Sequence, residues 1–263
     1  MPLTKPLDKP MVLSWLDAFF KKLVKLSQVK CNREGNLVKT TMIHRYFAEF
    51  MGTFFFVLIG CGTAITAVSL AGLGVALSFG LTLAAVHFMA APISGGHINP
   101  AVSFFFWLCK KMEFKDFLFY VVAQLLGATI AIGVLYFVLS GKTDFNNLYY
   151  TNGFGMGSPN GSGMLQAGIM EILLTAFFIA VFVHLQDAKG TCVSSSLLLG
   201  LALTSAYFLA TPFTNGSLNP ARSFGPALFE GGYAMQQIWF FFLMPMLGSV
   251  IAMFVYKTLG KNK

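Results

Sequence analysis

Two stretches of the chain decide its fold: Gly95-Gly-His-Ile-Asn-Pro-Ala-Val102 and Leu218-Asn-Pro-Ala-Arg-Ser-Phe-Gly-Pro-Ala227. Both carry the triplet Asn-Pro-Ala, formed by Asn99, Pro100 and Ala101 in the first stretch and by Asn219, Pro220 and Ala221 in the second. Asparagine is a favoured N-cap, and proline suits the first helical position because its missing N–H would have no partner there. Each triplet therefore predicts the start of a helix, over 99–109 and 219–229. Runs of this length are too short to cross about 30 Å of hydrocarbon.

The composition of the whole chain indicates a membrane protein. Of the 263 residues, 56% are hydrophobic and only 11% are charged, whereas soluble domains are about one quarter charged. This excludes a disordered chain and indicates that lipid covers most of the surface. Six apolar runs are long enough to span a bilayer, and they lie at 42–68, 74–91, 114–140, 164–185, 194–210 and 235–258. The sequence predicts an all-α membrane protein with six transmembrane helices and two re-entrant half-helices.

The two halves of this channel domain, 42–258, repeat each other. Glu49 and Glu171 are 122 residues apart, and Asn99 and Asn219 are 120 residues apart. Repeat 1 covers about 42–140 and repeat 2 about 164–258. Because each repeat contains three spans, an odd number, the second must be inverted relative to the first. The two half-helices would then meet at the midplane, where the positive ends of their dipoles face each other.

Basic residues predict the orientation. Sixteen of the eighteen Lys and Arg fall on the side that holds both termini, and only Lys142 falls on the other side. By the positive-inside rule both termini are cytoplasmic. The N-terminal region 1–41 contains an amphipathic basic helix at about 11–30, which we interpret as a membrane-surface or packing helix, with a lid over the cytoplasmic mouth as the alternative. Residues 259–263 form a short cytoplasmic tail.

Arg222 is the eighteenth basic residue and lies at membrane depth. An arginine there is costly unless it faces water or a partner. A water-filled pore wall satisfies this condition, and an ion pair with a buried carboxylate is the alternative.

These motifs resemble the twin signatures of the aquaporins, the major intrinsic protein family, over about residues 42 to 258. The resemblance implies a passive water channel driven by an osmotic gradient, assembled as a homotetramer in which each subunit holds its own pore. It also implies a selectivity filter, which counting from the two triplets places at Phe79, Tyr207, Gly216 and Arg222. Phe79 and Arg222 resemble the water-selective branch, whereas Tyr207 departs from it because a histidine is usual there.

Four other positions bear on the same choice of permeant. They resemble water channels more than glycerol channels, and they are Ser223, Ala227, Phe241 and Phe242. We therefore expect water as the main solute. The alternative is a facilitator of small neutral solutes, namely glycerol, urea, ammonia or hydrogen peroxide.

Further residues are expected to build the pore and its supports. Carbonyl groups that accept hydrogen bonds from the solute are expected at Gly95, Gly96, His97, Asn215, Gly216 and Ser217. Glu49 and Glu171 could relay protons, but in the resemblance they brace the re-entrant loops by hydrogen bonds. His87 is expected to be a buried packing residue.

Regulation is predicted on the cytoplasmic side and modification on the outer side. Ser194, Ser195 and Ser196 are candidate phosphorylation sites that could bias a gate, and His184 could sense pH. Asn160 begins a glycosylation sequon in the outer loop.

Other classes of protein remain as alternatives to the channel. An ion-coupled or proton-coupled transporter would need a coupling site, and a structural membrane protein would have an impermeable pore. The sequence predicts no enzyme activity, no cofactor, no metal site and no nucleic-acid partner; its partners are water or small neutral solutes, and the lipid bilayer. The membrane is either the plasma membrane or that of an intracellular vacuole.

Overall fold

The computed structural model describes residues 41–66, 71–139, 150–188 and 192–259. Six helices in this part are long and apolar enough to cross a membrane, which confirms the predicted all-α architecture. They are α2 (Met42–Thr66), α3 (Ala71–Ser94), α5 (Phe114–Leu139), α6 (Met164–Asp187), α7 (Cys192–Thr214) and α10 (Ile238–Leu259). The predicted amphipathic helix at 11–30 and the tail 259–263, except for Leu259, lie outside the described residues.

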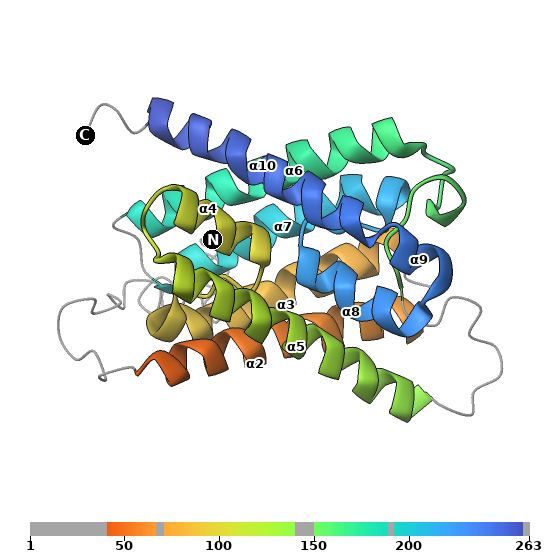
Figure 1. The fold of residues 1–263 in the computed structure, drawn as a ribbon, viewed down its shortest axis with the longest axis horizontal. Coiled ribbons are helices and arrows are strands. Elements are labelled where there is room, and N and C mark those ends of the chain that lie inside the picture. Colours follow the sequence, from red (N-terminus) through yellow and green to blue (C-terminus); the bar gives the residue numbers. More distant parts are fainter. Residues whose placement is uncertain (1–40, 67–70, 140–149, 189–191, 260–263) are drawn as a thin grey trace, which may run out of the picture.

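Two half-helices, α4 (Pro100–Leu108) and α8 (Pro220–Glu230), lie between the long helices and point in from opposite ends of the bundle (Figure 1). Their N-termini meet in the middle. The Asn99 side-chain amide donates to the Leu218 carbonyl at 2.8 Å, and the Asn219 amide donates to the Ile98 carbonyl at 2.9 Å. The inverted pair of half-helices that the two triplets predict is therefore present.

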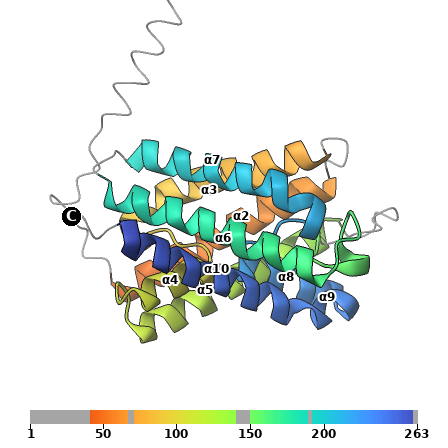
Figure 2. The same ribbon diagram turned by 90° about the horizontal axis from the view of Figure 1, so that it is seen from above.

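Helix packing follows the repeat. In the first half α2 packs on α3 and α5, and in the second half α6 packs on α7 and α10. The two halves join where α3 packs along α7, and the two helices lie side by side (Figures 1 and 2). We call the end of the bundle where α2 begins the Arg45 end, and the opposite end the Tyr150 end.

Glycines set the distance between α3 and α7. A methyl group added at Gly80 would lie 2.5 Å from the Gly200 carbonyl oxygen, and one added at Gly200 would lie 2.4 Å from the Gly80 carbonyl oxygen. Only glycine fits at both positions, because the contacted atoms belong to backbone that cannot move independently.

Three helix boundaries differ from the apolar runs. Helices α3 and α7 run on to Ser94 and Thr214, past Pro92 and Pro212, which lie in their last turns. A proline there removes one helical hydrogen bond. The final span begins at Ile238 rather than near 235, because the short helix α9 (Gly232–Gln236) precedes it. A 3₁₀ turn, η2 (Gly155–Gly157), lies in the loop before α6.

The outer surface of the long helices is apolar. Phe137 is 79% exposed and Leu165 is 73% exposed, and large apolar side chains on every long helix share this exposure. Such a surface is stable in hydrocarbon and not in water. The chain is an integral multi-pass membrane protein.

The close contact of α3 and α7 predicts the effect of a single methyl group. We expect Gly80→Ala to lower the thermal stability of the detergent-purified protein, because overpacking a core typically costs about 1–3 kcal/mol. Gly72→Ala is the control, since its added methyl group has no neighbour within 4 Å. Equal melting temperatures for the two variants would contradict the packing argument.

Candidate functional site

A buried carboxylate braces each re-entrant loop. In the first repeat the Glu49 Oε1 accepts hydrogen bonds from the Ser94 hydroxyl at 2.7 Å and the His97 N–H at 2.9 Å. Its Oε2 accepts from the Ile98 N–H at 2.6 Å and the Gln124 amide at 2.8 Å. Glu49 is completely buried, so these four donors replace the water that an exposed carboxylate would bind.

Glu171 makes the matching set in the second repeat. It accepts from the Thr214 hydroxyl at 2.6 Å, the Ser217 N–H at 3.0 Å and the Leu218 N–H at 2.8 Å. The loops need this support because Ile98 and Leu218 have φ values of 55° and 54°, a region that bulky side chains rarely adopt. The geometry matches the bracing role that the resemblance implies, and all the groups bonded to both carboxylates are neutral.

Asn99 and Asn219 lie together at the junction of the half-helices. Each caps its own helix, because the Asn99 Oδ1 accepts from the Ala101 N–H and the Asn219 Oδ1 accepts from the Ala221 N–H. Both line a small cavity of about 10 Å³, which is about the space that one water molecule occupies. Each side-chain amide has one N–H beyond the bond that joins the repeats, and this second donor is available to a molecule in the cavity.

Phe79 and Tyr207 face each other beside this cavity, toward the Tyr150 end. Their ring centroids are 4.6 Å apart, and both side chains are completely buried. The Tyr207 hydroxyl donates to the Ser217 carbonyl at 3.1 Å, which fixes the ring position. Gly216 has φ of +62°, and a methyl group there would lie 3.1 Å from Tyr207 Cδ1. A larger residue at this position would therefore need a strained backbone and a small shift of the Tyr207 ring.

Arg222 is completely buried and completes the predicted filter. Its guanidinium lies over the Phe79 ring, 5.3 Å from the centroid, and over the Tyr150 ring at 4.9 Å. It donates to the Tyr150 carbonyl at 3.0 Å and to the Asn215 carbonyl at 3.1 Å. Within the described ranges no carboxylate forms an ion pair with it, and its Nε has no protein partner there. The arginine is held by dipoles and aromatic faces, and Nε remains as a free donor.

Asn152 is a functional residue that the sequence reasoning missed. Its Oδ1 accepts from the Arg222 guanidinium and from the Ser223 hydroxyl, and its Nδ2 donates to the Thr214 carbonyl at 2.8 Å. The residue comes from the loop before α6, which has no fixed spacing to either triplet. Other asparagines, serines and glycines fill the same segment, so nothing in the sequence distinguishes Asn152.

Several of the predicted pore carbonyls are already occupied. The Gly95 carbonyl accepts from the Gln186 amide at 3.2 Å, the Asn215 carbonyl from Arg222, and the Ser217 carbonyl from Tyr207. A carbonyl oxygen has two lone pairs and can accept a second hydrogen bond, so contact of all six carbonyls with the solute stays a prediction. Among the described residues, the carbonyls of Gly96, His97 and Gly216 accept no side-chain hydrogen bond.

A wider cavity of about 400 Å³ lies at the Arg45 end. Its wall includes Arg45, Lys111 and Gln186, and His97 borders both this cavity and the small one at the midplane. His97 is held by a contact of 3.1 Å between its Nδ1 and the Ser103 hydroxyl, and its ring stacks on Phe106 with centroids 4.4 Å apart. His97 therefore lies between the two cavities.

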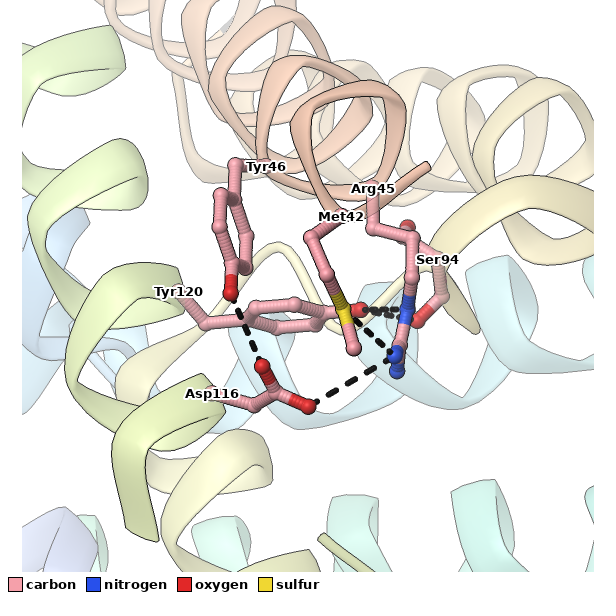
Figure 3. A network of polar contacts seen from close by, with 6 residues as sticks. All are labelled: Met42, Arg45, Tyr46, Ser94, Asp116 and Tyr120. Carbon is pink, nitrogen blue, oxygen red and sulfur yellow. Dashed lines mark hydrogen bonds and ion pairs between the residues drawn. The ribbon is translucent and has the colours of Figure 1, made fainter. Parts of the chain in front are cut away.

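A polar network fixes one wall of the wider cavity (Figure 3). The Tyr120 hydroxyl donates to the Ser94 carbonyl at 2.7 Å and accepts from the Arg45 Nε at 3.1 Å. Asp116 accepts from the Tyr46 hydroxyl at 2.8 Å and lies 3.6 Å from the Arg45 Nη1. The network joins the start of α2, the end of α3 and the start of α5.

Lys111, which also borders the wider cavity, is held by Asp187 and Tyr256. Lys111 donates to the Tyr256 hydroxyl at 2.8 Å and to Asp187 at 3.3 Å. Burial lowers the pKa of the Lys111 ammonium, but the hydrogen bond to Tyr256 and the charge of Asp187 outweigh it and raise this pKa above its ordinary value. The ammonium is therefore charged at neutral pH.

The predicted regulatory residues are spread over the surface and the core. Ser196 is buried and its hydroxyl lies 2.8 Å from the His87 Nδ1, so a kinase could reach it only if α3 and α7 separated. Ser194 and Ser195 are half-buried, and His184 is exposed with its Nδ1 2.7 Å from the Ala180 carbonyl. Asn160 is exposed at the Tyr150 end, and its glycosylation stays a prediction.

The fold and the pore residues together define the class: a membrane channel built from two inverted three-helix repeats. Comparison with known proteins agrees. The profile of the family described as "Major intrinsic protein" matches residues 36–256, which is most of the chain. The chain belongs to the major intrinsic protein family, whose members are channels for small neutral molecules and are not enzymes.

One solved structure gives the same fold. It is the X-ray structure of the aquaglyceroporin from Plasmodium falciparum, which aligns with a TM-score of 0.76 and 22% sequence identity. The alignment covers 84% of this chain and 98% of the other. At this identity the likeness establishes the fold alone, and it does not support the expected preference for the water-selective branch over the glycerol-conducting branch.

The hydrogen bonds that Asn152 accepts from Arg222 and Ser223 predict that Asn152 is important for stability. We expect Asn152→Ala to lower the melting temperature of the purified protein, because loss of a hydrogen bond to a charged group typically costs about 1.5–3 kcal/mol. Asn160→Ala, an exposed asparagine on the same side of the bundle, is the control and should change the melting temperature less. A smaller loss of melting temperature at Asn152 than at Asn160 would show that the hydrogen bond between Arg222 and Asn152 does not stabilise the fold.

Proposed function

We propose that the protein is a passive channel for water and other small neutral solutes. One observation carries the proposal: two asparagine amides share a buried cavity of about one water molecule in volume at the meeting point of two helix N-termini. Each N-terminus contributes a partial positive charge of about half a unit. A neutral molecule can accept hydrogen bonds there, whereas a cation or an excess proton is repelled.

The buried Arg222, toward the Tyr150 end, also supports a channel for neutral solutes. Its Nε provides a donor for the oxygen of a passing solute, and its charge opposes the entry of cations. A transporter coupled to protons would need a carboxylate exposed to the pathway, but both buried glutamates have their oxygens occupied by loop donors. This geometry favours a channel over an ion-coupled transporter.

Crowding at the predicted filter supports water as the first permeant. The Phe79 and Tyr207 rings are in contact, with centroids 4.6 Å apart, and the hydrogen bond of Tyr207 to Ser217 holds the Tyr207 ring in place, so a solute passes beside this pair and not between the rings. Glycerol is the second candidate. It is favoured by the fold likeness to an aquaglyceroporin and by the aromatic pair, which could pack against the carbon chain of a small polyol.

The orientation and assembly are part of the proposal. The Arg45 end, which carries Arg45, Lys110, Lys111 and Lys115, would face the cytoplasm by the positive-inside rule. The exposed apolar helices would contact lipid and, in a homotetramer, the neighbouring subunits. Candidate control points for gating lie at the same end, where the wider cavity opens.

Stopped-flow shrinkage of proteoliposomes tests the proposal. We expect osmotic shrinkage faster than that of empty liposomes, with a weak temperature dependence, because water passes a preformed pathway. Tyr207→Ala should raise glycerol permeability several-fold, since it removes one ring of the filter. Tyr233→Ala is the control, because Tyr233 is exposed and its hydroxyl only contacts the Phe154 carbonyl at 3.3 Å.

Two results would count against parts of this proposal. Shrinkage at the rate of empty liposomes for both an impermeant osmolyte and glycerol would exclude an open channel. Fast glycerol entry in the unmodified protein, unchanged in Tyr207→Ala, would exclude the aromatic pair as the size filter and leave glycerol as the principal permeant.

A further inference from the structure

His87 occupies, in the first repeat, the place that Tyr207 occupies in the second. The two residues are 120 residues apart, the same separation as Asn99 and Asn219. Leu83 and Leu203 have this separation too, and both line the midplane cavity. Since the repeats are inverted, His87 should stand on the Arg45 side of the midplane where Tyr207 stands on the Tyr150 side.

The contacts of His87 and Tyr207 with their re-entrant loops also match. A methyl group added at Gly216 would lie 3.1 Å from Tyr207 Cδ1, and one added at Gly96 would lie 2.9 Å from His87 Cδ2. Both glycines have nearly the same backbone conformation, with φ of +62° and +64°. Each ring therefore lies against the glycine of its own re-entrant loop.

The position of His87 on α3 agrees with a pore-facing side chain. Phe79, Leu83 and His87 follow one another at intervals of four residues, which places them on one face of the helix. Phe79 belongs to the predicted filter and Leu83 lines the midplane cavity. His87 is the next residue along this face toward the Arg45 end.

One edge of the His87 ring is fixed and the other lacks a partner. The Nδ1 lies 2.8 Å from the Ser196 hydroxyl of α7. The side chain is only 6% exposed, and its Nε2 has no hydrogen-bond partner among the residues that the structure describes. The Cδ2–Nε2 edge faces Gly96, whose carbonyl accepts no side-chain bond. Buried polar atoms are nearly always paired, so an unpaired Nε2 here indicates a small hydrogen-bonding ligand.

His87 lies near His97, which borders both cavities. Both imidazoles contact the Phe182 ring edge-on, with centroid distances of 5.4 Å for His87 and 6.1 Å for His97. His87 and His97 therefore pack against the same phenyl ring, between the wider cavity and the midplane.

We propose that His87 forms a second selectivity site, on the Arg45 side of the midplane, in which Nε2 hydrogen-bonds the passing neutral solute. This inference rests on the proposed channel function and adds a residue that determines which solutes pass. The site differs from the outer filter in charge. At the positions related to Arg222 and Phe79 the chain has Val102 and Leu199, so the inner site selects by size and one hydrogen bond, without a cation.

Two substitutions separate contact with the solute from a purely structural role. Glutamine places its amide near the position of Nε2, whereas asparagine places its amide near the position of Nδ1. If Nε2 contacts the solute, His87→Gln keeps the glycerol-to-water permeability ratio of the unmodified protein and His87→Asn raises that ratio several-fold. If His87 only links α3 to Ser196, the asparagine variant keeps the ratio and the glutamine variant changes it, which would overturn the proposal.

The measurement is made in proteoliposomes by stopped flow, in the unmodified protein and in the Tyr207→Ala background. Two constrictions in series limit flux together, so the effect of His87→Asn should be larger once Tyr207 no longer restricts glycerol. His44→Gln and His44→Asn are the matched controls, because His44 is exposed at the Arg45 end and its side chain hydrogen-bonds to Thr41 among the described residues.

The outcomes distinguish the inference from the function on which it rests. Unchanged ratios in both His87 variants and both backgrounds, with fast water flux in the unmodified protein, would overturn the inner site and leave the channel intact. No flux of water or glycerol in the unmodified protein would overturn both. Melting temperatures of the variants, measured in detergent, confirm that a changed ratio comes from folded protein.

Discussion

The rest of the structure depends on satisfying backbone N–H groups at the middle of the membrane. A half-helix that starts there has four N–H groups without helical partners, and hydrocarbon offers none. The chain solves this with one buried carboxylate in each repeat, Glu49 and Glu171, whose oxygens bind the N–H groups of the approaching loop. The side-chain amides of Asn99 and Asn219 then donate across the midplane to carbonyls of the other repeat. With these bonds in place, irregular backbone can lie at membrane depth and leave polar atoms facing a narrow passage.

This symmetric frame carries different side chains at equivalent positions. Tyr207 and Arg222 of the second repeat, with Asn152 from the loop before α6, make the predicted filter crowded and cationic. In the first repeat a histidine and Val102 occupy the related positions, and the entrance widens into a cavity of about 400 Å³. The backbone supports are almost identical in the two halves, so the difference in electrostatics between the two sides comes from a few substitutions rather than from a different architecture.

The sequence predicts most of the fold because the strongest signals are local or periodic. Apolar runs identify the six spans, and the paired triplets identify the half-helices, their inversion and their meeting point. Spacing from the triplets also finds Phe79 and Tyr207, which the structure brings together as a tilted ring pair. The same spacing does not find Asn152 and Gln186, because their positions depend on how a loop and a helix end fold over the site. For a related reason, the sequence does not indicate that the hydroxyl of Tyr207 bonds to the Ser217 carbonyl.

The cross-links at the midplane also constrain the order in which the protein can be made. Asn99 bonds to the carbonyl of a residue 119 positions later, and Asn219 bonds back to Ile98. When the ribosome has released only the first repeat, the end of α4 at the midplane lacks the acceptor that the second repeat will supply. The midplane contacts therefore cannot form until the second half-helix has been synthesised, and the centre of the molecule is completed late although its first residues are made early.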